Sequence, residues 1–304
     1  MSDEPLSQAE IILHQTADGG TRVPVRLPDE TVWLAQQPVT ELLQTSRQNG
    51  SLPIQNLFAE GARCEDSIVE GFTLLPGYPR IKRVKSFQEL VATPFGDGIN
   101  ALCWPRTLAG DFGEVVEHLG AGEGIPTPDE ARLASLPVSA AGRVAIEILL
   151  EDARRLREHD RDPVLNCIHG YPRDEDAGPV RTDVFSFHAD SAPVEADTWL
   201  CTYHGPASEG LRNDEARRRV DLPETRAELL QLFGGEDDDD FLAYLNEHHY
   251  DLHSAPIPQA RPFSFGLGNL WRVAVDWPGS AVPPCIHRAP GTLPGEPPRL
   301  LLIS

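Results

Sequence analysis

The sequence predicts a mixed α+β protein, mainly β, in which short strands form a barrel or sandwich supported by helices. Short apolar, strand-like segments recur between residues 84 and 304, and loops rich in proline and glycine separate them. Residues 139–158 differ, because their apolar residues recur near every 3.6 positions, as in an amphipathic helix. Many short strands around one long helix are typical of a barrel or sandwich with helical support.

Length and composition are compatible with two folded domains. The chain has 304 residues, 40% of them hydrophobic, and domains commonly have about 100–200 residues. The character of the sequence changes near residue 75. We therefore expect a small N-terminal module over residues 1–70 and a larger domain over residues 75–304.

The N-terminal module begins with a predicted β-hairpin over residues 9–27. Apolar residues alternate on both sides of the turn Asp18-Gly19-Gly20, where glycine tolerates a positive φ. A short strand at 31–34 and two short helical stretches, near 38–43 and 51–60, follow. These elements together predict a winged-helix-like unit.

The larger domain has a regular succession of expected elements. The segments Phe87–Val91 and Ile99–Trp104 are apolar without a clear type. Expected helices are Leu108–Leu119, a helix that starts at Thr127–Glu130, Ser139–Glu158, Thr225–Phe233 and Asp239–His249. The apolar face of Ser139–Glu158 is expected to contain Val144, Ile148, Ala153 and Leu156. Expected strands are Val164–Cys167, Val184–Phe187, Thr198–Tyr203, Leu270–Val275, Cys285–His287 and Leu300–Ile303.

Charge and cysteine content exclude several classes of function. With 26 basic and 47 acidic residues the net charge is −21, which disfavours non-specific DNA binding and attraction to anionic membranes. No apolar run approaches the roughly 18 residues that span a bilayer, and the acidic start lacks signal-peptide features. The five cysteines include no Cys-x-x-Cys pair, so we expect reduced thiols in a cytoplasmic, soluble protein.

The segment most informative about chemistry is Asp183-Val-Phe-Ser-Phe-His188-Ala-Asp190. An alternating strand that ends in His-x-Asp projects His188 and Asp190 to the same side. An imidazole and a carboxylate side by side are two thirds of a 2-His-1-carboxylate triad, which holds Fe(II) and leaves three positions open. His287, in a later strand-like segment, is the candidate third ligand.

Two further residues are candidates for binding a co-substrate. Arg299 opens the last strand, where double-stranded β-helix oxygenases have a basic residue that binds the far carboxylate of 2-oxoglutarate. A planar guanidinium suits a carboxylate better than a lysine does. Many such oxygenases carry Arg-x-Ser or Arg-x-Thr, whereas Leu301 occupies that second position here. Tyr203, on the strand after the His-x-Asp motif, is a candidate hydrogen-bond donor to the keto acid.

Each of these residues also has a structural interpretation. His188 would simply be hydrogen-bonded to Asp190, His287 would be a satisfied core histidine, and Arg299 would pair with an acidic neighbour. Tyr203 would pack in the core, as strand tyrosines usually do.

The N-terminal region resembles the bacterial virulence-protein RhuM family. The resemblance covers residues 9–70 and rests on Glu10-Ile-Ile-Leu-His-Gln-Thr, Thr31-Val-Trp-Leu-Ala-Gln and Glu41-Leu-Leu-Gln-Thr-Ser-Arg-Gln-Asn-Gly-Ser-Leu-Pro-Ile. It implies a helix-turn-helix and contact with DNA. However, Gly50 and Pro53 would interrupt the recognition helix, and Arg47 and Arg63 are its only nearby cations, so we expect no DNA binding by residues 1–70.

The rest of the chain is similar to a bacterial family known as domain of unknown function 1826. Its residues here are Phe187-His188-Ala-Asp190, Trp199–Leu211, Trp277-Pro-Gly, Ile286-His287-Arg-Ala-Pro290 and Pro298-Arg299-Leu-Leu-Leu, with an earlier Cys103-Trp-Pro-Arg106. The pattern looks like a distant member of the iron- and 2-oxoglutarate-dependent oxygenases. The resemblance implies a double-stranded β-helix (jelly-roll, cupin-like) core with flanking helices.

We therefore predict an Fe(II)- and 2-oxoglutarate-dependent dioxygenase of the hydroxylase type, with O2 as co-substrate. His188, Asp190 and His287 would be the metal ligands, and Arg299 and Tyr203 would bind 2-oxoglutarate. Two alternatives stay open. One is a metal-binding jelly-roll protein without 2-oxoglutarate chemistry, and the other is a non-catalytic regulator that binds DNA or a protein through residues 1–70.

Overall fold

The computed structural model describes residues 10–14, 21–24, 78–120, 122–173, 178–291 and 297–304. The chain divides into two compact units, Met1–Glu70 and Gly71–Ser304. In the first unit, β1 (Glu10–His14) and β2 (Thr21–Pro24) pair in antiparallel fashion, which confirms the two strands of the predicted hairpin. The other elements predicted for the winged-helix-like module lie outside the described residues.

The second unit is a mixed α/β structure, mainly β, built on two six-stranded sheets. The first sheet has the order β3 (Ile81–Arg83), β4 (Ala101–Trp104), β12 (Leu270–Ala274), β7 (Asp197–His204), β14 (Arg299–Ile303), β5 (Val164–Ile168). The second sheet has the order β11 (Phe263–Ser264), β8 (Glu209–Leu211), β13 (Ile286–Arg288), β6 (Phe187–His188), β10 (His253–Pro256), β9 (Ala216–Arg218). Neighbouring strands are antiparallel except for β3 and β4, which are parallel.

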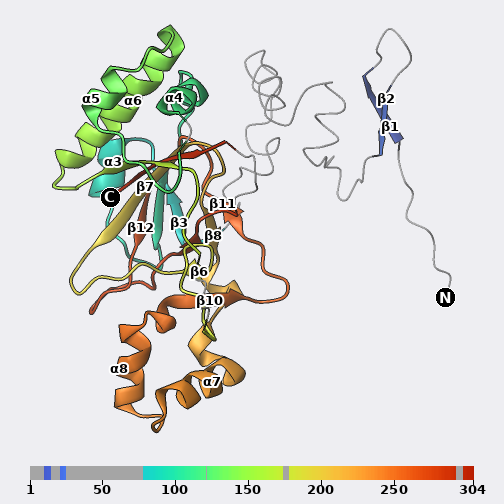
Figure 1. Ribbon diagram of the computed structural model, residues 1–304. Coiled ribbons are helices and arrows are strands. Elements are labelled where there is room, and N and C mark those ends of the chain that lie inside the picture. Colours follow the sequence, from blue (N-terminus) through green and yellow to red (C-terminus); the bar gives the residue numbers. More distant parts are fainter. Residues whose placement is uncertain (1–9, 15–20, 25–77, 121, 174–177, 292–296) are drawn as a thin grey trace. The chain divides into compact units, whose positions relative to one another are not determined.

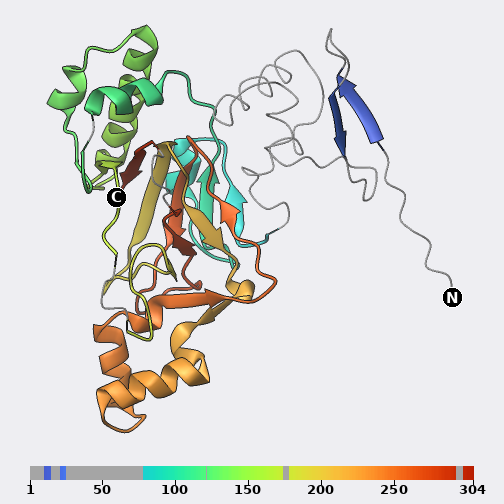
Figure 2. The same ribbon diagram turned by 45° about the vertical axis from the view of Figure 1, so that its right-hand side comes forward.

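The helices of the second unit form two groups at opposite ends of the sheets (Figure 1, Figure 2). The first group is α3 (Phe87–Ala92), α4 (Phe112–Leu119), α5 (Glu130–Ala134) and α6 (Ala140–Arg157). The second group is α7 (Pro223–Phe233) and α8 (Asp239–Glu247), inserted between β9 and β10 with the short 3-10 helices η2 (Arg219–Asp221) and η3 (Tyr250–Leu252). A further 3-10 helix, η1 (Asn213–Glu215), precedes β9.

The first sheet has two different buried faces because successive strand residues point to opposite sides. On β7, Trp199, Cys201 and Tyr203 pack against the first group of helices, whereas Leu200 belongs to the core between the sheets. The core between the sheets also contains Trp271 of β12. This alternation decides which residues of β7 and β14 face the interior where a site can form.

Helix α6 confirms the predicted long helix and most of its predicted apolar face. Ser139 caps its N-terminus by accepting from the amide of Gly142, and Glu158 follows its last turn. Ala153 and Leu156 are buried and Ile148 packs against the same core, whereas Val144 is 38% exposed, so its assignment to the apolar face was wrong.

A buried polar network joins α6 to the first sheet. Asp152 of α6 accepts hydrogen bonds from Arg106 at 2.7 Å and from the hydroxyl of Tyr203 at 2.7 Å. Both carboxylate oxygens therefore have a partner, as a carboxylate in a core requires. An aspartate inside an apolar stripe was not expected from the sequence, because its partners are distant along the chain.

Most predicted strands and helices of the larger domain are confirmed within a few residues, and one strand is not. The predicted strand Val184–Phe187 is instead a turn up to Ser186. The Asp183 carboxylate accepts a hydrogen bond from the amide of Phe185, and the Asp183 carbonyl accepts one from the amide of Ser186. Only Phe187 and His188 are extended and paired in β6. Asp190 consequently lies after the strand and not in it.

Two simple predictions can be compared with the described residues. Within them, no helix is both long enough and apolar enough to cross a membrane. The four described cysteines, Cys103, Cys167, Cys201 and Cys285, are free and buried, as the sequence predicts, and Cys64 lies outside the described residues.

Replacement of Asp152 by alanine should strongly destabilise the second unit. It would leave the Arg106 guanidinium and the Tyr203 hydroxyl buried without their partner, at a cost of about 3–5 kcal/mol. Urea unfolding measures this free energy. Glu151→Ala is the matched control, because the adjacent Glu151 makes only exposed ion pairs, worth about 1 kcal/mol or less. Equal losses for both variants would contradict this assignment.

Candidate metal centre

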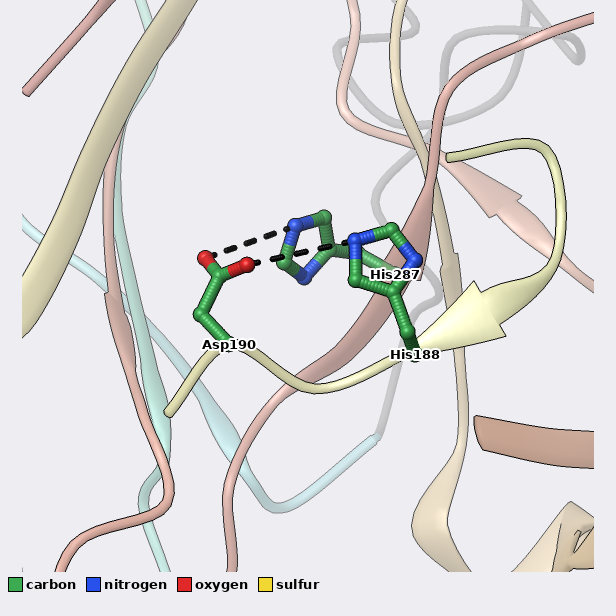
Figure 3. Close-up of side chains that lie close together, drawn as sticks. All are labelled: His188, Asp190 and His287. Carbon is green, nitrogen blue, oxygen red and sulfur yellow. Dashed lines mark ion pairs between the residues drawn. The ribbon is translucent and has the colours of Figure 1, made fainter. Parts of the chain in front are cut away.

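His188, Asp190 and His287 lie close together, the two histidines on neighbouring strands of the second sheet and Asp190 in the loop after β6 (Figure 3). One ligand atom from each residue lies within 4.8 Å of the others, and among the described residues no other group of histidine, cysteine and acidic side chains does so. The His188 Nε2 to Asp190 Oδ1 distance is 3.9 Å, and the His287 Nε2 to Asp190 Oδ2 distance is 3.7 Å. The three side chains are 16%, 33% and 10% exposed, so the group is largely but not completely buried.

The strand register explains why the two histidines meet. His287 of β13 is the direct antiparallel partner of His188 of β6, so both side chains leave the sheet on the same face. Their ring centroids are 4.9 Å apart. The loop after β6 then brings Asp190 to the same place, because the Asp190 carbonyl accepts from the amide of Asp276 at 2.7 Å.

The distances distinguish a metal site from a simple hydrogen-bonded pair. Both histidine–carboxylate separations exceed 3.5 Å, which is too long for a hydrogen bond. One ion with metal–ligand bonds of about 2.0–2.2 Å can nevertheless bridge atoms that are this far apart. The interpretation of His188 as merely hydrogen-bonded to Asp190 is therefore not supported by the structure.

Backbone carbonyls set the orientation of both imidazoles. Nδ1 of His188 lies 2.7 Å from the carbonyl of Ser186, and Nδ1 of His287 lies 3.4 Å from the carbonyl of Cys285. A carbonyl can only accept, so each Nδ1 carries the proton and each Nε2 has its lone pair free on the side of Asp190. This is the tautomer that a metal-binding histidine needs.

The electrostatics also favour the metal-binding protonation states. Burial lowers the pKa of His188, and the neighbouring His287 adds to the effect, so the neutral imidazole persists to lower pH. Burial alone would raise the pKa of Asp190, but the two imidazoles and a hydrogen bond from Thr198 outweigh it and the pKa is lowered. A neutral histidine and an ionised aspartate are the forms that coordinate a divalent ion.

Arg299 is buried without a carboxylate partner among the described residues. Its side chain is 2% exposed and donates to three neutral hydroxyls: Tyr171 at 2.9 Å, Thr202 at 3.0 Å and Ser208 at 2.5 Å. Its Nε is buried with no partner in the part of the chain that the structure describes. Burial is the main reason that the pKa of this guanidinium is lowered. The alternative interpretation, in which Arg299 pairs with an acidic neighbour, finds no support among the described residues.

The register of β8 relates Arg299 to the metal centre. His287 is the direct partner of Gly210, and Ser208, which binds Arg299, lies two positions before Gly210 on the same side of the chain. Diagonal neighbours of this kind are about 7–8 Å apart across an antiparallel pair. Ser208, and with it the guanidinium of Arg299, therefore lies on the same face of the second sheet as His287.

The proposed role of Tyr203 in co-substrate binding is not consistent with its position. Tyr203 is 4% exposed, stacks on Phe112 with ring centroids 5.3 Å apart, and donates its hydroxyl to Asp152. It therefore faces the helices, because adjacent residues of β7 point to opposite sides and Thr202 faces the interior. The hydroxyl that β7 presents to Arg299 comes from Thr202.

Several residues of the site were missed from the sequence. Because Trp199 faces the helices, strand alternation along β7 would have placed Thr202 on the opposite, interior face. Tyr171 and Ser208 lie in loops, where no periodicity indicates the direction of a side chain. Thr198, which donates to Asp190, follows from the same alternation on β7. His253 pairs with His188 on the neighbouring strand, with ring centroids 5.6 Å apart, and its Nδ1 has no partner among the described residues.

Comparison with known proteins gives no further guide to this site. No family model, no curated protein and no solved structure matches the chain.

Acidification should destabilise the protein through His253. Burial, with the charges of His188 and Arg219, lowers the pKa of His253 to about 4, whereas the unfolded value is near 6.5. Between these values the unfolded chain binds a proton that the folded chain does not, so stability is lost as pH falls through this range. The loss from this group between pH 7.5 and pH 5 should be about 2 kcal/mol.

Urea unfolding at the two pH values measures this loss. His253→Gln should weaken the pH dependence, and the exposed His248 provides the control, because His248→Gln should leave it unchanged. A His253→Gln variant with the full dependence of the wild type would show that another group is responsible.

Proposed function

We propose that residues 71–304 form a non-haem Fe(II)- and 2-oxoglutarate-dependent dioxygenase on a jelly-roll (double-stranded β-helix) core. The observation that carries the proposal is the buried Arg299, which has only neutral partners among the described residues and faces the same interior as the His188, Asp190 and His287 group. A buried cation whose described partners are all neutral is costly, which favours an anionic ligand beside it.

The strand order supports the jelly-roll assignment. Eight strands, taken in chain order, are β5, β6, β7, β8, β11, β12, β13 and β14. They are distributed as β5-β14-β7-β12 in one sheet and β6-β13-β8-β11 in the other. The pairs are nested in chain order. The first strand pairs with the last (β5 with β14), the second with the seventh (β6 with β13), the third with the sixth (β7 with β12) and the fourth with the fifth (β8 with β11). Such nested pairing of a folded-over hairpin is the pattern of a jelly roll.

The donor set supports iron as the metal. Two histidines and one carboxylate are the donor set of the facial triad of non-haem Fe(II) oxygenases. A site of four cysteine or histidine ligands would favour structural zinc instead, and no described cysteine belongs to the group of possible ligands.

The surroundings of Arg299 support a carboxylate ligand. The guanidinium is planar and can bind a carboxylate through two parallel hydrogen bonds. Tyr171, Thr202 and Ser208 hold it and can also donate their hydroxyl protons to the same anion. Oxygenases with an Arg-x-Ser motif have a hydroxyl at the position of Leu301, which here packs in the core between the sheets. Hydroxyls from β7 and from two loops take that place.

The residues have separate tasks in the proposed reaction. His188, Asp190 and His287 would hold the metal, and Arg299 would bind the far carboxylate and so orient the keto-acid end toward it. The apolar side chains of Phe265 and Trp271 beside His287 would keep bulk water from the interior. When bound, iron and 2-oxoglutarate supply the activation of O2, so that substrate is hydroxylated while the co-substrate is converted to succinate and CO2.

Replacement of Arg299 by glutamine should separate co-substrate binding from metal binding. Calorimetric titration of 2-oxoglutarate into the Fe(II)-loaded protein without oxygen should show affinity at least about 30-fold weaker than in the wild type, because a buried charge pair is lost. Fe(II) affinity should be unchanged. Arg288→Gln is the matched control, since Arg288 pairs with Glu209 and stacks on Phe187, away from the interior.

Equal 2-oxoglutarate affinity in wild type and Arg299→Gln would contradict the proposed co-substrate. Metal binding without any 2-oxoglutarate binding in the wild type would favour the jelly-roll metal protein that does not use a keto acid.

A further inference from the structure

We propose that Thr198 is a positioning residue that restricts Asp190 to metal coordination through one oxygen. Its hydroxyl would hold Asp190 Oδ2 outside the coordination shell and leave Oδ1 as the ligand atom. This inference rests on the metal site of the proposed function, and it concerns a residue that no sequence motif marks.

The hydrogen bond between the two residues is short and comes from a rigid element. The Thr198 hydroxyl donates to Asp190 Oδ2 at 2.5 Å. Thr198 lies in β7, paired with Val273 of β12, near the centre of the first sheet. The strand therefore fixes the position of the donor, and the donor fixes the rotation of the carboxylate.

The backbone of Asp190 is held independently of its side chain. Its carbonyl accepts from the amide of Asp276, and the amide of Ala192 donates to the carbonyl of Asp276 at 2.8 Å. Loss of the Thr198 hydroxyl should therefore free the carboxylate to rotate without releasing the loop. A change in coordination can in this way be distinguished from a change in fold.

The two carboxylate oxygens have different surroundings. Oδ2 has the hydrogen bond from Thr198, whereas Oδ1 accepts no hydrogen bond from any described residue and lies 3.9 Å from His188 Nε2. The oxygen without a hydrogen bond has its lone pairs free for a metal. Oδ2, although it lies 3.7 Å from His287 Nε2, is already engaged.

The number of ligand oxygens determines how many positions remain for reactants. Two imidazoles and one carboxylate oxygen occupy three of six octahedral positions, which leaves three open. A carboxylate bound through both oxygens leaves two, and a keto acid that chelates would then occupy both. The Thr198 hydroxyl would thus preserve the position that O2 needs.

The experiment uses Mn(II) as the probe and does not depend on activity. Broadening of the Mn(II) electron paramagnetic resonance lines in 17O-enriched water counts the bound waters, and Mn(II) titration gives the affinity. We expect three waters in the wild type and in Thr198→Ser, which keeps the hydroxyl. Thr198→Val, which has nearly the same shape without the hydroxyl, should show two waters and an affinity changed by about 10-fold or more.

Thr198→Ala is a second hydroxyl-free variant in case the valine variant does not fold, and circular dichroism establishes folding for each. Three waters and wild-type affinity in a folded hydroxyl-free variant would overturn the inference, and so would a Ser variant that behaves like the Val variant. A wild type that binds no Mn(II) or Fe(II) would instead overturn the metal site on which the inference rests.

Discussion

The pairing of β6 with β13 is the constraint on which the candidate site depends. This pairing sets His188 directly opposite His287, and a shift of one residue would turn one of the two imidazoles to the outer face. The outer face has a different composition, with Phe187, Leu211 and Ile286 in a small apolar cluster. Burial of that cluster on one side therefore fixes the register that brings the two histidines together on the other.

The second constraint is the unneutralised charge of Arg299. Among the described residues the guanidinium has only hydroxyl partners, which lowers the stability of the folded chain, and such local conflicts are expected at functional sites. The contrast with Arg106 is informative. Arg106, whose side chain is 8% exposed, has Asp152 as its counter-ion. The two arginines thus differ in charge pairing, and we propose a ligand-binding role only for Arg299.

Much of the architecture follows from local sequence patterns. Helix α6 was predicted almost to its caps, because Ser139 and the 3.6-residue period are local signals. The strands β5, β7, β12 and β14 were also identified, since each has several apolar residues within five to eight positions. Short strands such as β8 and β10 were not, because three or four residues carry little periodicity and are stabilised mainly by pairing with distant neighbours.

The candidate metal ligands were recognisable from the sequence for a different reason than the residues around them. His188 and Asp190 form a spaced motif, and His287 is a histidine in a predicted strand, so chemistry marks them. The partners of Arg299 are ordinary hydroxyls in loops and strands, which acquire meaning only in three dimensions. Tyr203 was misassigned because strand parity was not applied, and parity alone assigns Tyr203 to the helices and Thr202 to the interior.

The central claim is that the histidine–aspartate group and Arg299 bind one metal–keto acid complex. The most direct measurement is an anaerobic titration of the wild type and of His188→Ala with Fe(II), in the presence and absence of 2-oxoglutarate, followed by visible absorption. The account predicts a weak charge-transfer band that requires both Fe(II) and 2-oxoglutarate and is absent from His188→Ala. Iron binding with no such band in the wild type would contradict it.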